Sequence, residues 1–236
     1  MLNDIDLKNS IYFTDEIIYL KKKLYYINNN KLYQIKKKNW IKYFKKNGWE
    51  LLNYKNNKIY GNPLGYLECG GDGNCFFYSV IEALNNPLNK NEDLYTFNDI
   101  KNLIANQINK DNYKIIIDLY KIQKKQDFFF DNWDPEEVNN LEDLRNVFKN
   151  LGKDFWADHI TIDLLQDAIS TNIHILYLDE HNNLLKYQTM NNLNYKKNIF
   201  LLYVDEIHFQ LIGCFYNNSF ETLFTNNIPK ILKELI

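Results

Sequence analysis

Cysteine, arginine, proline and glycine are all scarce in this 236-residue chain. It has three cysteines, four prolines and eight glycines, and Arg145 is its only arginine. The cysteines, Cys69, Cys75 and Cys214, cannot all pair within one chain, and no CxxC spacing occurs. A disulfide framework and a zinc ribbon are therefore excluded, and a reducing compartment is favoured.

Long apolar runs are absent too. No stretch approaches the ~20 residues that a membrane span requires. The first residues, Met-Leu-Asn-Asp-Ile-Asp, lack the basic flank and apolar centre of a secretory signal. We therefore expect no membrane span and a cytoplasmic protein, not a secreted one. Hydrophobic residues at 45% and charged residues at 25% are typical of a soluble globular protein.

Charge is unevenly distributed along the chain. Residues 1–60 hold 13 lysines and 5 acids, about +8, whereas residues 61–236 hold 15 basic and 25 acidic residues, about −10, which together give the net −2. A basic segment rich in aromatic residues can bind nucleic acid. Lysine, asparagine, isoleucine and tyrosine dominate everywhere, however, as an A/T-rich coding sequence would produce. We expect residues 1–60 to dock on the acidic remainder or bind a partner, in preference to nucleic acid.

The pattern of residues divides the chain into three parts: 1–60, 61–216 and 217–236. In the first, two apolar stretches at 24–27 and 32–35 flank Asn28-Asn29-Asn30, which predicts a hairpin. A short helix is expected at 39–46, and Gly61-Asn62-Pro63 breaks the chain. The last part is expected to be a helix or a tail.

The middle part alternates between helical and strand patterns. Phe77, Val80, Ile81 and Leu84 have the i, i+3, i+4, i+7 spacing of a helix with one buried face. Helices are also expected at 98–125, 143–151 and 158–170, a loop at 131–140, and strands at 173–178, 199–204 and 208–213. This order predicts an α+β fold with helices packed on a sheet.

The most informative motif is a glycine-rich turn, Gly70-Gly71-Asp72-Gly73-Asn74, that leads to Cys75 at the start of a helix. A helix N-terminus stabilises a thiolate, so we expect the pKa of Cys75 to be lowered. Gly71 and Gly73 allow backbone N–H groups to point at one spot, as an oxyanion hole requires. The turn does not fit a Walker A loop, a dinucleotide fingerprint or an EF-hand. A buried structural cysteine remains the alternative.

A nucleophilic cysteine needs a base, and the chain has four histidines. His174 lies within an apolar strand and His181 in a polar turn, so we expect both to be structural. His159 near a helix start could line a site. His208 follows the strand pattern at 199–204, where a scaffold would present a base. The order Cys75 then His208 is that of papain-type proteases.

Three segments resemble the ovarian tumour (OTU) family of cysteine proteases. Gly71–Val80 resembles the family's Cys box, His208–Gly213 its His box, and Phe155–Ile160 its middle block. The resemblance covers roughly residues 64–216. It implies a papain-like OTU fold with a central, mainly antiparallel sheet. It also implies a deubiquitinase that uses no metal or cofactor and whose partners are conjugates of ubiquitin or a related modifier. Large viruses carry such proteases, so we expect a viral source and action in the host cytoplasm.

The resemblance also assigns roles to individual residues. Cys75 is the nucleophile, His208 the general base, and Asp72 the acid that organises the turn. The backbone N–H groups of Asp72, Gly73 and Cys75 are expected to form the oxyanion hole.

One position departs from the family's pattern. The family usually has Asp or Asn two residues after the histidine, where this chain has Gln210. In a strand, Glu206, His208 and Gln210 share a face, so either neighbour is a candidate to orient the imidazole. Gln210 could do so by accepting the ring N–H through its amide oxygen. A weak orienter leaves a second hypothesis open, that the chain is a catalytically weak or inactive OTU-like module that binds ubiquitin or another partner.

Overall fold

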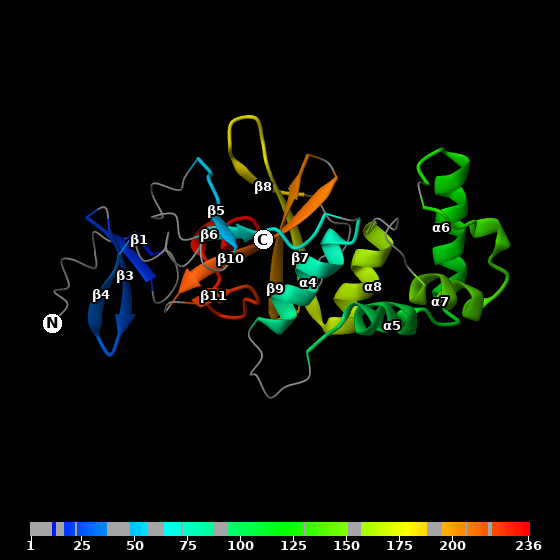
Figure 1. Cartoon of the computed structure of the whole chain (residues 1–236), viewed down its shortest axis with the longest axis horizontal. Helices are drawn as coiled ribbons and strands as arrows, with labels where there is room; N and C mark the ends of the chain where they lie inside the picture. The colour runs from blue at the N-terminus through cyan, green and yellow to red at the C-terminus, as the bar shows by residue number, and fades with distance from the viewer. Residues whose placement is uncertain are drawn as a thin grey trace.

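The computed structural model describes residues 11–12, 17–21, 23–36, 48–55, 64–71, 73–86, 94–129, 131–150, 157–187, 195–205, 207–216 and 219–236 of the 236-residue chain. They form two sheets and a group of helices (Figure 1). The helix expected at 39–46 and the break at 61–63 lie outside the described residues. So do Asp72, Glu206 and residues 155–156 of the predicted middle block.

The larger sheet has seven strands in the order β5-β6-β10-β9-β7-β8, with β11 paired to β10. Neighbouring strands run antiparallel except β7 and β9, which run parallel. The strands are β5 Trp49–Leu51, β6 Leu64–Leu67, β7 Thr171–Leu178, β8 Leu184–Lys186, β9 Lys197–Val204, β10 His208–Tyr216 and β11 Ser219–Glu221. The predicted α+β fold with a mainly antiparallel central sheet is confirmed.

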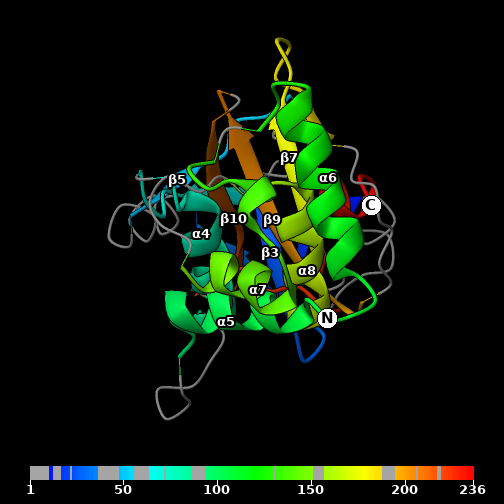
Figure 2. The same cartoon turned by 90° about the vertical axis from the view of Figure 1, so that its right-hand side faces the viewer.

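Helices cover this sheet and extend beyond its far end. Figure 2 shows α4, α5, α7 and α8 gathered in front of the strands, with α6 alongside them. They are α4 Cys75–Asn85, α5 Phe97–Gln107, α6 Tyr113–Lys125, α7 Leu141–Lys149, α8 His159–Ile169 and the short α9 Lys230–Lys233, with a 3-10 turn, η1, at Pro135–Glu137. Helix α4 contacts β10 and β9, so the motif-bearing helix lies directly against the centre of the sheet.

One predicted helix is divided in two. The sequence predicts helix throughout 98–125, whereas the structure ends α5 at Gln107 and begins α6 at Tyr113. The side-chain oxygen of Asn112 accepts from the Asn109 backbone N–H at 2.7 Å, and that of Asn109 accepts from the Asp111 N–H at 2.8 Å. These local bonds occupy N–H groups that a continuous helix would have paired, so the asparagines favour a turn.

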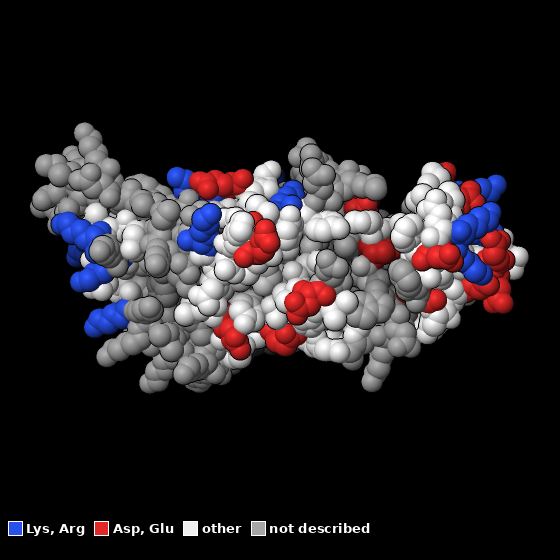
Figure 3. All heavy atoms as spheres, turned by 90° about the horizontal axis from the view of Figure 1, so that it is seen from above, with Lys and Arg blue, Asp and Glu red and all other residues white. Residues whose placement is uncertain are grey.

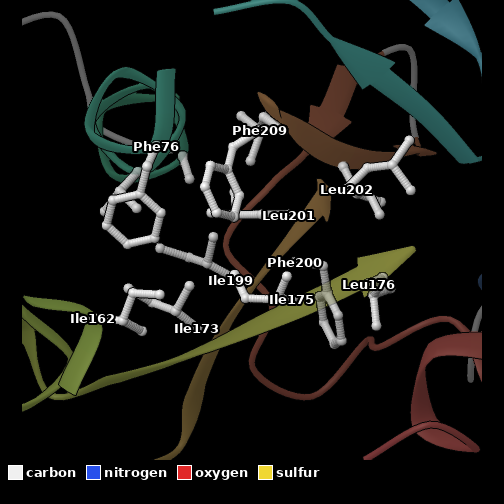
Figure 4. Close-up of a cluster of buried hydrophobic side chains, with 14 of the residues drawn as sticks. Phe76, Ile162, Ile173, Ile175, Leu176, Ile199, Phe200, Leu201, Leu202 and Phe209 are labelled. Carbon is white, nitrogen blue, oxygen red and sulfur yellow. The ribbon is translucent and has the colours of Figure 1, made fainter. Parts of the chain in front are cut away.

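The core lies between α4, α8 and the central strands. Phe76 of α4, Ile162 of α8, and Ile173, Ile199 and Phe209 of the sheet point into it (Figure 4). The rings of Phe76 and Phe209 meet edge to face with centroids 5.4 Å apart. Because such burial stabilises by about 1.5–3 kcal/mol per large side chain, this contact holds the start of α4 against the start of β10.

The N-terminal residues form a separate four-stranded antiparallel sheet, β1-β2-β3-β4. Its strands are β1 Ile11–Tyr12, β2 Ile17–Leu20, β3 Lys23–Asn28 and β4 Lys31–Ile35. The predicted hairpin is confirmed: β3 pairs with β4 across Asn29 and Asn30, whose φ values of 47° and 57° suit a tight turn.

Two features connect residues 1–60 with the rest of the chain. Ile17 and Leu24, 0% and 3% exposed, belong to the same buried cluster as the main core, and β5 is a strand of the larger sheet. Exposed lysines, including Lys23 and Lys31, give this end of the molecule its basic surface (Figure 3). The small sheet therefore joins the main core through buried apolar side chains and has a basic outer surface.

A glycine leaves room for two stacked rings beside β10. The Trp49 and Phe220 rings stack 4.2 Å apart, and a Cβ at Gly213 would lie 2.6 Å from Trp49 and 2.8 Å from Phe220. We expect Gly213→Ala to lower the free energy of unfolding by about 1–3 kcal/mol or more, because no flexible side-chain end can move aside. Urea unfolding measures this loss. Gly71→Ala is the control, since a Cβ there meets nothing within 4 Å; equal stability of both variants would contradict the prediction.

None of the helices in the described ranges combines the length and the hydropathy that crossing a bilayer requires.

Candidate active site

Helix α4 begins at Cys75, as the motif predicts. The preceding turn uses glycines where the backbone demands them, because Gly70 and Gly73 have φ values of 148° and 84°, a region that residues with a Cβ rarely adopt. Asn74, between Gly73 and the cysteine, is buried, and its side-chain oxygen finds no hydrogen-bond partner among the described residues. The turn thus delivers Cys75 to a helix N-terminus with its own N–H among the unpaired groups of the first turn.

Phe209 fixes the position of α4 relative to β10. Its backbone N–H donates to Cys75 Sγ at 3.4 Å, and its carbonyl oxygen accepts from Ser79 Oγ, one helical turn further along α4, at 3.4 Å. Since His208 precedes Phe209 in the chain, these two bonds fix the backbone that carries the predicted base relative to the start of α4. Within the described residues, no hydrogen bond joins the Cys75 thiol to the imidazole.

The thiol of Cys75 is more basic than the sequence suggests. Burial raises its pKa, since the side chain is 2% exposed, and backbone N–H groups of Phe209, Phe76 and Cys75 itself oppose this by lowering it. The nearby Glu68 charge adds to the increase. The expectation of a lowered pKa was therefore wrong in direction, because desolvation outweighs the helix N-terminus here. The group is a protonated thiol at neutral pH.

His208 is the first residue of β10, and its Nε2 contacts Oε1 of Glu68, which follows β6. The His208 side chain is 23% exposed, so a substrate can reach the ring. An imidazole held through Nε2 carries its proton on that nitrogen when neutral, which leaves Nδ1 as the basic atom.

Gln210 contacts Glu68, not the imidazole. Its Nε2 donates to Glu68 Oε2 at 3.0 Å. The predicted arrangement, in which the Gln210 amide oxygen accepts from the ring, is replaced by one in which the carboxylate lies between the two side chains. Glu206, the other candidate orienter, lies outside the described residues, as does Asp72 of the predicted oxyanion hole.

Glu68 is the residue that sequence reasoning missed. Strand β6 pairs with β10 so that Leu67 faces Leu211, and one further step in this antiparallel register puts Glu68 opposite Gln210. The only available signal was an acid directly after a short apolar strand. The pairing of that strand with the histidine strand cannot be deduced from local patterns, because the two are about 140 residues apart in the chain.

The remaining histidines lie away from this cluster. His174 is buried in β7, where its Nε2 meets Asn198 Oδ1 at 2.9 Å and its ring stacks on Phe200. His181 lies in an exposed turn beside Glu180, and His159 is exposed at the start of α8. Among the described residues, no group of three or more His, Cys, Asp or Glu side chains could hold a metal ion.

Burial makes His174 an acid-sensitive element of the fold. Desolvation, opposed by the Asn198 hydrogen bond, lowers its pKa to about 4 from the usual 6.5. As the pH falls, His174 therefore takes up a proton in the unfolded chain before it does so in the folded chain. Its contribution to the stability of the folded state is fully present above about pH 6.5 and is lost as the pH falls toward 4. We expect the wild-type chain to lose about 2 kcal/mol between pH 7 and pH 5 from this group.

Urea unfolding at both pH values measures this loss. In His174→Gln, which cannot titrate, the pH dependence should become smaller by that amount, whereas His181→Gln should keep it. An unchanged pH dependence in His174→Gln would contradict the assignment.

Together these residues provide the parts for acyl transfer. Cys75 can supply a sulfur nucleophile, His208 a base whose Nε2 contacts a carboxylate, and the first turn of α4 a set of N–H donors. No bound metal or cofactor is needed for such a reaction, in which the thiol and the imidazole exchange protons.

Solved structures similar to this chain include several OTU proteins. One is an ovarian tumour (OTU) domain in complex with ubiquitin, with a TM-score of 0.46 and 17% identity over 73% of this chain and 80% of that one. Another is an OTU deubiquitinase from Wolbachia pipientis wMel bound to ubiquitin, with a TM-score of 0.41 and 11% identity over 64% and 95%. A third is the viral OTU domain protease from Dera Ghazi Khan virus, with a TM-score of 0.39 and 22% identity over 65% and 82%.

Sequence comparison gives the family. No curated protein matches the chain at a significant level. The model of the OTU-like cysteine protease family matches residues 70–211, which include Cys75, His208 and Gln210. The match spans 142 of the 236 residues, more than half. The chain therefore belongs to the OTU-like cysteine protease family.

Proposed function

We propose that this chain is a deubiquitinase that cleaves isopeptide or thioester-type bonds at the ubiquitin C-terminus, with Cys75 as nucleophile and His208 as base. The observation that carries this proposal is the double attachment of Phe209 to α4, through Cys75 Sγ and Ser79 Oγ, each at 3.4 Å. It fixes the backbone next to His208 relative to α4, which supports a role for the imidazole as the base for Cys75. Family membership supports ubiquitin conjugates as the substrate class.

The raised pKa of Cys75 defines the first step. Because the resting group is a thiol, His208 removes its proton as sulfur attacks the carbonyl carbon of the terminal glycine. A C–S bond forms, and the carbonyl π electrons move to oxygen. The tetrahedral intermediate then collapses, the C–N bond breaks, and the imidazolium gives its proton to the departing lysine amine.

The second half of the reaction restores the enzyme. Water gives a proton to His208 and attacks the thioester carbonyl, and the C–S bond breaks to release the ubiquitin carboxylic acid and the Cys75 thiolate, which regains the proton from the imidazolium. The N–H groups of Gly73 and Cys75, with that of Asp72, are the proposed donors to the oxyanion in both halves. Gly73 allows the close backbone approach that this role needs, because it has a φ of 84° and no Cβ.

A binding module is the second candidate function. The observation that favours it is the state of the thiol, which is 2% exposed and has a raised pKa, so that it is poorly nucleophilic until a partner rearranges the site. In this alternative, ubiquitin binds without being cleaved.

One experiment separates the two candidates. The purified chain is incubated with ubiquitin that carries a C-terminal propargylamide, and the products are weighed by intact-mass spectrometry, while a ubiquitin C-terminal fluorogenic amide measures turnover. The enzyme is expected to gain one ubiquitin mass at Cys75 and to turn over the amide. Binding of ubiquitin in calorimetry with neither adduct nor turnover would favour the module and refute the enzyme.

A further inference from the structure

In the cluster of Glu68, His208 and Gln210, the carboxylate contacts both other side chains, an arrangement that the motif does not predict. Each oxygen of the Glu68 carboxylate has its own partner: Oε1 contacts His208 Nε2, and Oε2 accepts from Gln210 Nε2 at 3.0 Å. A carboxylate held at both oxygens has a fixed plane and a fixed distance from the ring. The imidazole is thereby contacted by the residue that follows a different strand, β6, and not by its own strand neighbour.

The backbone explains why this carboxylate reaches the ring. Residues 208 and 210 lie on the same face of β10, and the register that pairs Leu67 with Leu211 brings Glu68 opposite residue 210 on that face. Glu68 thus approaches the pair from across the strand gap and can contact both side chains at once.

Charge explains why position 210 is an amide. A carboxylate at 210 would lie directly opposite Glu68, and like charges facing each other across a strand pair destabilise it. Glutamine avoids this repulsion and donates a hydrogen bond instead. The absence of a carboxylate at position 210 is therefore accounted for by the acid at 68.

A negative group at this position serves the chemistry of the ring better than a neutral acceptor does. An acceptor at Nε2 keeps the proton on that nitrogen and leaves Nδ1 basic, and a negative acceptor also stabilises the imidazolium that forms during attack. An amide oxygen would meet the first need but little of the second. The Glu68 side chain is 54% exposed in the free chain, so bound substrate that excludes water would strengthen the pair.

We propose that Glu68 is the positioning residue of this active site, orienting His208 and stabilising its charged form, and that Gln210 acts by holding Glu68. The assignment rests on the proposed hydrolytic function only for its kinetic test. The acid that orients the base, Glu68, then precedes the proposed nucleophile, Cys75, in the chain.

The decisive variant is Glu68→Gln, which keeps the shape and removes the charge. Its turnover number for the ubiquitin fluorogenic amide should fall about 10-fold to 100-fold with KM changed less than about 2-fold, because the ground-state contacts of the substrate are untouched. Glu50→Gln is the matched control. Glu50 is an exposed acid of β5 in the same sheet whose side chain accepts from Tyr66 Oη at 2.5 Å, and its loss should leave turnover unchanged.

An exchange variant tests whether charge or only shape matters. Glu68→Gln combined with Gln210→Glu returns a carboxylate to the cluster, now at position 210 of β10. Its turnover number should exceed that of Glu68→Gln by about 10-fold, as expected if a negative acceptor is what the imidazole requires. A double variant no faster than the single one would overturn this requirement.

The tautomer of His208 provides a readout that needs no activity. In ¹⁵N-labelled protein, the ring nitrogens of His208 should show the proton on Nε2 in the wild-type chain and a mixture of tautomers in Glu68→Ala, which has no acceptor at this position. If the wild-type chain has no hydrolytic activity, the proposed function fails, yet this comparison still decides the role of Glu68. Turnover of Glu68→Gln within about 3-fold of wild type, together with an unchanged tautomer in Glu68→Ala, would overturn the proposal.

Discussion

Cys75→Ala is expected to abolish both hydrolysis and adduct formation with the ubiquitin electrophile. The substitution removes the only sulfur at the N-terminus of α4, so no covalent intermediate can form. The fold should survive, because the variant loses little beyond the hydrogen bond that the Phe209 N–H donates to Cys75 Sγ, which is worth about 1 kcal/mol. Intact mass after incubation with the electrophile, turnover of the fluorogenic amide and a thermal melt measure the three effects.

Cys69→Ala is the matched control for this experiment. Cys69 is a few residues away from Cys75 and half-buried, but burial raises the pKa of its thiol to about 11, so it is almost entirely protonated at neutral pH. This variant should keep parental turnover and still form the adduct. Residual cleavage by Cys75→Ala at the parental rate would refute the nucleophile assignment.

His208→Ala is expected to lower the turnover number by about 10²-fold to 10⁴-fold, because the proposed mechanism uses this ring for every proton transfer. The loss should be severe because the Cys75 thiol, whose pKa is raised by burial, has little thiolate to offer without a base. Steady-state kinetics on the fluorogenic amide give the ratio. The unfolding midpoint should change little, since the His208 side chain is partly exposed at the start of β10.

Two other histidines serve as controls for the base. His181→Ala, in an exposed turn beside Glu180, should leave both turnover and stability unchanged. His174→Ala should lower stability through its buried contacts with Asn198 and Phe200, while turnover per folded molecule is preserved. Equal kinetic loss in His181→Ala and His208→Ala would show that His208 is not the base.

Local patterns predicted the elements that carry the chemistry. The spacing of Phe77, Val80 and Leu84 indicated α4, and all three are buried in it. The apolar runs that became β9 and β10 were identified in the right order, and the Asn29-Asn30 turn matched its hairpin. These features depend on residues close in the chain, where side-chain periodicity and backbone conformation are coupled directly.

The parts that the sequence could not give depend on long-range pairing and on burial. The partner of Gln210 follows from the register of β6 with β10, which no local pattern contains. The pKa of Cys75 depends on how completely the thiol is removed from water, and this results from the packing of β10 against α4, not from the glycine turn. The N–H groups at the start of α4 do lower the pKa of Cys75, but burial by the tertiary structure raises it by more.

The central place of β10 in the larger sheet bears on when activity can first appear. This strand pairs with β6 on one side and β9 on the other, and it begins at His208, which the proposed mechanism pairs with a nucleophile 133 residues earlier in the chain. At ribosomal speeds of about 5–20 residues per second, the base is synthesised about 7 to 27 s after the nucleophile. During that interval, the growing polypeptide has a thiol, a glycine turn and Glu68 but no imidazole beside them. On the proposed mechanism, a nascent chain of this topology therefore has no base at its nucleophile until β10 inserts between its neighbours, and a product of premature termination before His208 lacks that base altogether.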